Sequence, residues 1–114
     1  MKNKVSLIVA SSMLFAMTAM NPVHAAADAG QAEALLKGNK CTKCHDAVKD
    51  KTGPSFKKTA AKFKGKADAE ATISKFLTTG PKIKNADGSE EEHKVIKAKD
   101  DAEVKNLVQW ILSQ

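Results

Sequence analysis

The sequence predicts an all-α domain of about four short helices. Three observations support this fold class. Apolar residues recur every three or four positions in four separate segments, which is the spacing of one helix face. Residues that favour helix caps stand at the start of these segments. No segment shows the alternation of apolar and polar residues that is typical of strands, and no internal repeat is present.

The first helix is predicted to begin after Asp28, which can cap it, and to end at Gly38-Asn39. Its apolar face carries Ala32, Leu35 and Leu36. The second helix is shorter and spans about Ser55 to Phe63, before Gly65. Its apolar face carries Phe56, Ala60 and Phe63, at positions i, i+4 and i+7.

The third helix is predicted to be capped by Asp68 and ended by Gly80-Pro81. Its apolar stripe consists of Ala69, Ile73, Phe76 and Leu77. The fourth helix opens with Asp100 and Glu103, an Asp variant of the capping box. Its apolar face carries Val104, Leu107, Val108 and Ile111, with Trp110 at the edge. Two stretches do not resemble helices, a polar loop over 46–53 and a longer one over 81–99. A loop as long as 81–99 in a small domain is usually functional or mobile.

Between the first two helices lies the pentapeptide Cys41-Thr42-Lys43-Cys44-His45, the C-x-x-C-H signature of covalent haem attachment. Each thiol adds across one of two vinyl groups on the porphyrin edge, so the thiols must lie about one helical turn apart. The histidine then points its imidazole at the iron. The sequence therefore predicts one covalently attached haem c.

Other chemistries remain open for two cysteines at this spacing. A zinc site needs four ligands, usually from a second cysteine pair or a closely spaced histidine pair, whereas the chain has only two cysteines and its other histidines, His24 and His93, stand far apart. A thioredoxin-like redox pair needs strand–helix alternation around it, and the flanking sequence is helical. A structural disulfide is the third alternative, since disulfides form in exported proteins.

Residues 1–25 are predicted to be a signal peptide, and residues 26–114 a single domain. Lys2 and Lys4 form a basic start, an apolar run follows, and Val23-His24-Ala25 provides small residues for cleavage after Ala25, or alternatively after Ala27. A retained membrane anchor is the alternative, although the apolar run is short for one. Export to the periplasm of a Gram-negative-type bacterium suits haem attachment, which takes place outside the cytoplasm.

The charge of the mature chain bears on its partners. Without Lys2 and Lys4, its 17 lysines exceed its 13 acids by four, and it contains no arginine. Because bidentate phosphate recognition favours arginine, nucleic acid is not expected as a partner. A lysine-rich surface suits redox proteins with acidic docking surfaces. No membrane span is expected after processing, and a monomer is expected.

The mature chain resembles the small bacterial class I cytochromes c. The resemblance rests on Cys41 to His45, on Gly53-Pro54 nine residues further on, and on Trp110-Ile111-Leu112 in the last helix. It implies a class I cytochrome c fold, with about four short helices wrapped around the haem and the first and last helices packed together. It also implies that the Pro54 carbonyl accepts a hydrogen bond from His45 and that Phe56 lies at the haem edge.

The sequence departs from this family at the sixth iron ligand. The family uses a methionine in the distal loop, but Met1, Met13, Met17 and Met20 all lie in the predicted signal peptide. His93 stands where the resemblance places that methionine, so we expect His45 and His93 to be the two iron ligands.

These observations predict a periplasmic electron carrier with bis-histidine ligation and a low potential, since the methionine ligand raises the potential of cytochromes c. The alternative is a haem protein that binds or senses a small ligand (NO, O₂ or CO) at a labile distal site. No catalytic residues are predicted, because no set of nucleophile, base and acid is visible.

Overall fold

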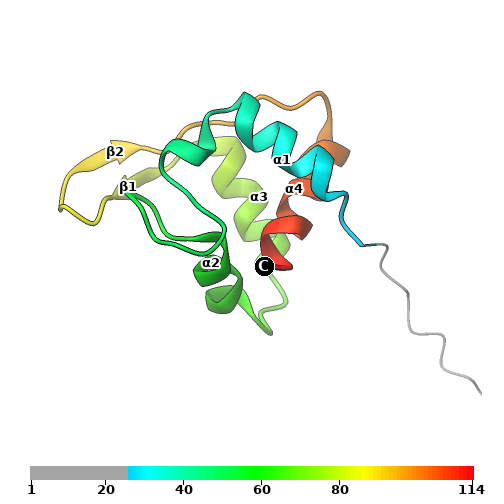
Figure 1. Ribbon diagram of the computed structural model, residues 1–114, viewed down its shortest axis with the longest axis horizontal. Helices are drawn as coiled ribbons and strands as arrows, with labels where there is room; N and C mark the ends of the chain where they lie inside the picture. The colour runs from blue at the N-terminus through cyan, green and yellow to red at the C-terminus, as the bar shows by residue number, and fades with distance from the viewer. Residues whose placement is uncertain (1–25) are drawn as a thin grey trace, which may run out of the picture.

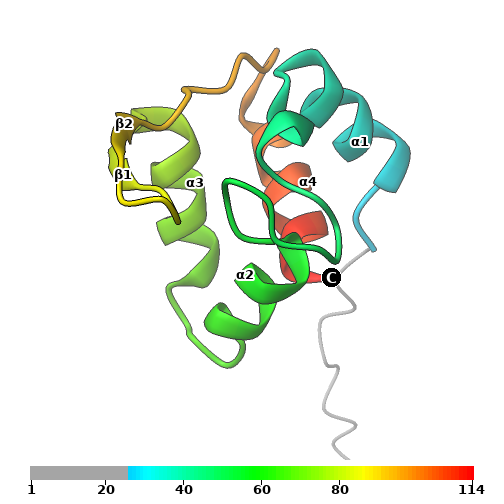
Figure 2. The ribbon, with the colours of Figure 1, turned by 60° about the vertical axis from the view of Figure 1, so that its left-hand side comes forward.

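The computed structural model describes residues 26–114, so the predicted signal peptide lies outside the described residues. The order of elements is α1 (Ala29–Gly38), the 3-10 turn η1 (Cys41–Lys43), α2 (Phe56–Phe63), α3 (Ala69–Thr79), β1 (Lys82–Lys84), β2 (Glu90–Glu92) and α4 (Asp101–Leu112). Helices α1, α2 and α3 each pack against α4 (Figures 1 and 2). The all-α prediction is confirmed.

The core lies on the inner face of α4. Leu107 and Val108 are completely buried there, and Leu35 and Leu36 of α1 belong to the same cluster. Caps fix where the helices begin. Asp28, Ser55 and Asp100 each accept a hydrogen bond from the backbone N–H three residues ahead, which satisfies a donor that the first helical turn leaves free.

Two predicted caps differ in detail from the structure. Asp68 precedes α3, but its carboxylate caps no backbone N–H and instead accepts from the Thr72 hydroxyl at 3.3 Å. Glu103 accepts from the N–H of Lys99 rather than from that of Asp100, one residue before the predicted partner. In both cases the carboxylate bonds to a different donor close to the predicted one.

The prediction that the chain contains no strands is wrong for part of the 81–99 loop. There β1 and β2 form a small antiparallel hairpin in which Lys82 faces Glu92 and Lys84 faces Glu90. Opposite charges at facing positions stabilise such pairs. The hairpin extends from the body of the molecule (Figure 1).

The chain after the hairpin is held at three points. The N–H of His93 donates to the carbonyl of Pro81 at 2.9 Å, and that of Ile96 donates to Leu77 at 3.0 Å. The N–H of Lys97 donates to the side chain of Asn39 at 2.7 Å. His93 therefore lies on a segment that is anchored to both α3 and the end of α1.

Candidate haem site

A cavity of about 880 Å³ opens between η1, the loop before α2, helices α2 and α3, and the hairpin. This volume lies toward the upper end of the range of about 300–1,000 Å³ for small-molecule and cofactor sites. All four helices contribute apolar side chains to its wall, namely Leu36, Phe56, Phe63, Ile73, Leu77 and Ile111. All six residues predicted to form the site also line it: Cys41, Cys44, His45, Pro54, Phe56 and His93.

The C-x-x-C-H motif folds as one tight turn. Lys40 has a left-handed backbone (φ 59°), which turns the chain out of α1 and into η1. The carbonyl of Cys41 then accepts from the N–H groups of both Cys44 and His45, at 3.2 and 3.0 Å. This places both thiols and the imidazole on the same cavity. Burial raises the pKa of the Cys41 thiol, with nearby Lys94 opposing the shift.

The alternatives for the two cysteines find no support among residues 26–114. No group of three or more His, Cys, Asp or Glu side chains there could hold a metal ion, as a zinc site requires. Both sulfur atoms are free thiols rather than a disulfide. The chain around them forms helices, without the strand–helix alternation of thioredoxins.

The imidazole of His45 is fixed on two sides. Its Nδ1 lies 2.6 Å from the carbonyl oxygen of Pro54, close enough for a strong hydrogen bond. Its ring stacks on Phe56, with 5.4 Å between the ring centroids. Phe56 in turn packs edge-on against Trp110 of α4 at 5.4 Å. These contacts leave Nε2 as the ring nitrogen available to a ligand.

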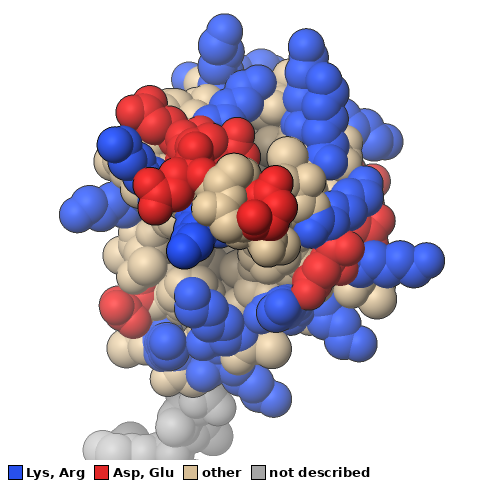
Figure 3. Space-filling view, turned by 90° about the vertical axis from the view of Figure 1, so that its left-hand side faces the viewer, with Lys and Arg blue, Asp and Glu red and all other residues tan. Residues whose placement is uncertain are grey.

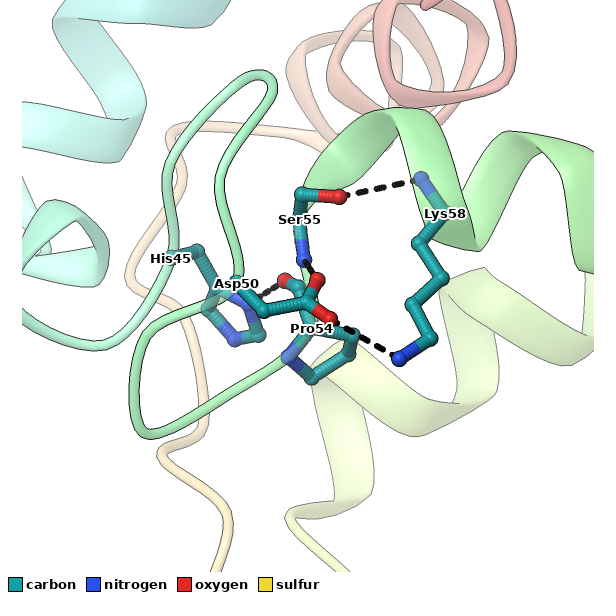
Figure 4. A network of polar contacts seen from close by, with 5 residues as sticks. All are labelled: His45, Asp50, Pro54, Ser55 and Lys58. Atoms are coloured by element: carbon teal, nitrogen blue, oxygen red, sulfur yellow. Dashed lines mark hydrogen bonds and ion pairs between the residues drawn. The ribbon is translucent and has the colours of Figure 1, made fainter. Parts of the chain in front are cut away.

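Asp50, which no motif in the sequence singles out, holds the peptide group next to Pro54. Its carboxylate accepts from the N–H of Ser55 and from the ammonium of Lys58, both at 2.8 Å (Figure 4). The hydrogen bond from Lys58, followed by that from Ser55, lowers the pKa of Asp50. The contact depends on the folded loop, so sequence reasoning missed this residue.

The side chain of His93 enters the cavity from the segment after β2. Its ring centroid lies 6.1 Å from that of His45 and 4.8 Å from that of Phe76. Its Nδ1 is 3.0 Å from the carbonyl of Lys94. Burial lowers the pKa of His93, which favours the neutral imidazole that binds metals.

Phe76 differs from its sequence-based placement. The apolar spacing predicts it within the buried stripe of the third helix, but it is 37% exposed and lies at the cavity beside His93. The apolar spacing correctly places Phe76 on the same helix face as Ile73 and Leu77. Part of that face borders the cavity rather than the packed core, so Phe76 stays partly exposed.

Six lysines line the cavity: Lys40, Lys43, Lys58, Lys62, Lys84 and Lys94. The acidic residues of the lining are Glu91 and Glu92. In the space-filling view, lysines surround one face of the molecule, while carboxylates gather on part of it (Figure 3). The wall of the cavity is thus largely apolar, and most of the charged side chains that line it are positive.

These residues fit a covalently attached haem. The cavity has the size and the apolar wall that a large planar cofactor needs, and two thiols stand one turn apart in that wall. The imidazole that follows them is already oriented by a backbone carbonyl, as is usual for histidines that bind metals. None of the helices within residues 26–114 is long and apolar enough to cross a membrane.

The chain is similar to proteins of known type. The family model "Cytochrome c" matches residues 27–114. Cytochrome c-551 of Pseudomonas aeruginosa is 37% identical over 86 residues, which is 72% of this chain and 75% of the relative.

Two solved structures share the architecture. The class 1 cytochrome MtoD from Sideroxydans lithotrophicus ES-1 is 52% identical, with a TM-score of 0.74 over 77% of this chain and 97% of the other. Wild-type cytochrome c552 of Nitrosomonas europaea is 28% identical, with a TM-score of 0.58 over 71% and 96% of the two chains. The chain therefore belongs to the cytochrome c family, as a class I monohaem electron carrier, rather than an enzyme, that holds haem c covalently through its C-x-x-C motif.

Proposed function

We propose that this cytochrome is a bis-histidine, low-potential electron carrier of the periplasm, with His45 as the proximal and His93 as the distal iron ligand. Cys41 and Cys44 provide the thioether links. The observation that carries the proposal is the pairing of the two imidazoles across one cavity, with the ring centroids 6.1 Å apart.

The separation of the two rings suits a shared metal ion. Metal–imidazole bonds are short, about 2.0–2.1 Å for zinc, so two histidines could hold one metal ion only where their rings lie a few ångströms apart, as these two do. Both histidines also have Nδ1 near a backbone carbonyl, Pro54 for His45 and Lys94 for His93. Metal-binding histidines almost always donate their second ring N–H in this way.

Each remaining site residue has a role in this proposal. Pro54 orients His45 through its carbonyl, and Phe56 packs on the His45 ring at the haem edge. An imidazole in place of the family's methionine lowers the potential. Haem, when bound, supplies a one-electron redox centre. Two fixed nitrogen ligands keep its surroundings similar in both oxidation states.

The surroundings of the cavity support the proposed partners and location. Six lysines in its lining suit a redox protein with an acidic docking surface. The signal-like residues 1–25 support export to the periplasm, where haem attachment takes place.

The test compares the holoprotein with His93→Ala. The wild-type ferric protein is expected to be low-spin at pH 7, and its ferrous form should bind CO slowly or not at all. His93→Ala should be high-spin at pH 7 and should bind CO rapidly. Lys94→Ala, which changes the adjacent residue, is the control and should resemble the wild type.

Two outcomes count against the proposal. A His93→Ala protein that keeps the wild-type low-spin EPR signal would show that another residue is the distal ligand. Rapid CO binding by the wild type would instead favour the sensing or binding of a small ligand.

A further inference from the structure

We propose that Asp50 is a positioning residue that tunes the haem potential through the Pro54–Ser55 peptide group, with Lys58 moderating its charge. This inference rests on the proposed function, because it requires His45 to be an iron ligand. The side chain of Asp50 makes no hydrogen bond to either cavity histidine. Asp50 instead bonds to the Pro54–Ser55 peptide group, whose carbonyl oxygen lies at Nδ1 of His45.

The Pro54–Ser55 peptide group contacts both His45 and Asp50. The carbonyl oxygen of Pro54 lies 2.6 Å from Nδ1 of His45. The N–H of Ser55, in the same peptide group, donates to Asp50 Oδ1 at 2.8 Å. Figure 4 shows the resulting row of groups, from the imidazole through the peptide to the carboxylate.

Amide resonance couples the two ends of this row. The peptide C–N bond has partial double-bond character, so electron density moves from nitrogen to oxygen. An anion that accepts from the N–H favours this shift and makes the carbonyl oxygen a stronger acceptor. Hydrogen bonds in such chains strengthen one another by about 10–30% per bond. Asp50 should therefore strengthen the bond to His45 and increase the electron density on its Nε2.

A more electron-rich imidazole stabilises the ferric ion relative to the ferrous ion. Hydrogen bonding to a ligand from outside the coordination shell is one of the ways in which proteins set haem potentials. The carboxylate of Asp50 should thus lower the potential. An aspartate is ionised at neutral pH, and the hydrogen bonds from Lys58 and then Ser55 lower the pKa of Asp50 further.

Lys58 opposes this effect. Its ammonium pairs with Asp50 Oδ2 at 2.8 Å, while Oδ1 faces Ser55. The ion pair withdraws charge from the carboxylate. Because Lys58 also lies in the cavity lining, a partner that docks there and binds Lys58 would weaken its ion pair with Asp50.

The backbone holds Asp50 in place for this role. Residues His45 and Asp50 form an isolated antiparallel bridge. The N–H of Gly53 donates to the carbonyl of Cys44 at 2.9 Å, and that of Lys51 donates to Gly53 at 3.0 Å. The loop is therefore closed against the haem-attachment motif, and Asp50 keeps a constant position relative to Pro54.

A simpler role for Asp50 is to satisfy the backbone N–H of Ser55, a residue that is only 3% exposed. An asparagine in place of Asp50 would fill that role equally well, because its side-chain oxygen can accept the same bond without the charge. Asp50→Asn therefore separates a tuning role from a purely structural one.

The experiment measures the midpoint potential and the NMR shift of the His45 Nδ1 proton in the ferrous holoprotein. Asp50→Asn should raise the potential and move the Nδ1 proton upfield, as the bond to Pro54 weakens. Lys58→Gln should do the reverse on both readouts. A structural role alone predicts neither the proton shift nor its reversal between the two variants.

Matched variants control for charge acting through space. Asp46→Asn removes an acid from the same loop whose carboxylate accepts from Val48 and Lys49, not from Ser55. Lys62→Gln removes a cavity-lining lysine that does not pair with Asp50. Neither control should move the Nδ1 proton. The potential shift of Asp50→Asn should persist at high salt, where charge effects between exposed groups are screened.

The results also separate this inference from the proposed ligation. Strong ring-current shifts of the His45 ring protons report that His45 binds iron, and their absence would overturn the proposed function. If those shifts are present but Asp50→Asn behaves like Asp46→Asn, the ligation stands and the role of Asp50 is refuted. If Asp50→Asn does not fold, the response of the Nδ1 proton to Lys58→Gln decides the question.

Discussion

Gly53 shows how closely the backbone approaches the proposed proximal histidine. A Cβ atom at this position would lie 2.6 Å from Cε1 of His45 and 3.0 Å from its Nδ1. The backbone cannot easily retreat, because the N–H of Gly53 is bound to Cys44 and its carbonyl to Lys51. Glycine at this position is therefore required by space, since any side chain would meet the imidazole.

Gly53→Ala should consequently destabilise the holoprotein by about 1–3 kcal/mol, the usual cost of overpacking. Denaturant unfolding of the two proteins measures this difference. Gly38→Ala is the control, because the Cβ it would gain has no atom within 4 Å from outside the backbone of its own helix and its chain neighbours. Equal stability of Gly53→Ala and the wild type would show that the His45 ring moves away freely.

Single residues could be predicted from the sequence where a motif or a resemblance marks them. The C-x-x-C-H motif marked Cys41, Cys44 and His45, and the resemblance marked Pro54 and His93. All of these line one cavity. Asp50 could not be predicted, because an aspartate in a polar loop is usually solvated and its contact with the Ser55 amide appears only after the loop folds.

At the scale of elements, the helices were predictable and the hairpin was not. Each helix combines an apolar period with residues that favour its ends, and these local signals agree with one another. The hairpin strands instead read Lys-Ile-Lys and Glu-Glu-Glu, and β2 is exposed along its whole length. Facing charges and the Asn85–Ser89 turn hold it together, which a search for apolar alternation does not detect.

The loop over residues 46–53 should respond to acid through its two aspartates. Backbone N–H groups of Lys49 and then Val48 lower the pKa of Asp46, and Lys58 and then Ser55 lower that of Asp50. Because both folded pKa values lie below the ordinary value of 3.8, these carboxylates stabilise the loop above pH 3.8. That stabilisation is lost as the pH falls through the folded values.

NMR titration of the holoprotein tests this expectation. The amide signals of Lys49 and Ser55 should titrate with midpoints below 3.8, the ordinary pKa of an aspartate. In Asp50→Asn, the titration of the Ser55 amide should disappear while that of Lys49 remains. Midpoints at or above that ordinary value would contradict the assigned hydrogen bonds.

At the scale of the whole molecule, two asparagines join parts of the chain that are far apart in sequence. Asn106 of α4 donates to the carbonyl of Asp28 and accepts from its N–H, at 2.9 and 2.8 Å, which fixes the start of α1. Asn39, at the end of α1, bonds to both the N–H and the carbonyl of Lys97. Long-range partners of this kind cannot be read from local sequence patterns.

Asn39→Ala should loosen the segment that carries His93. Asn39 is 4% exposed, and its two bonds to the N–H and the carbonyl of Lys97 are part-buried. Its loss leaves these two backbone groups without their partner, which costs up to about 1–3 kcal/mol. We expect a lower Tm and faster CO binding by the ferrous protein. Asn85→Ala is the control, because Asn85 bonds to exposed groups within the hairpin. Unchanged CO binding in Asn39→Ala would show that Asn39 does not restrain His93.

The hairpin is closed by a hydrogen bond between the residues that flank its two strands, so its turn can change in length without moving the cavity. The hydrogen bond from the N–H of His93 to the carbonyl of Pro81 joins the two ends of the hairpin, so the position of His93 does not depend on the turn between β1 and β2. Ala86, Asp87 and Gly88 in that turn are not part of the cavity wall. Lengthening a flexible loop is inexpensive, at about 0.6 kcal/mol per doubling. The turn is thus the place where natural insertions and deletions, or an engineered reporter sequence, can be accepted while both histidines stay in place.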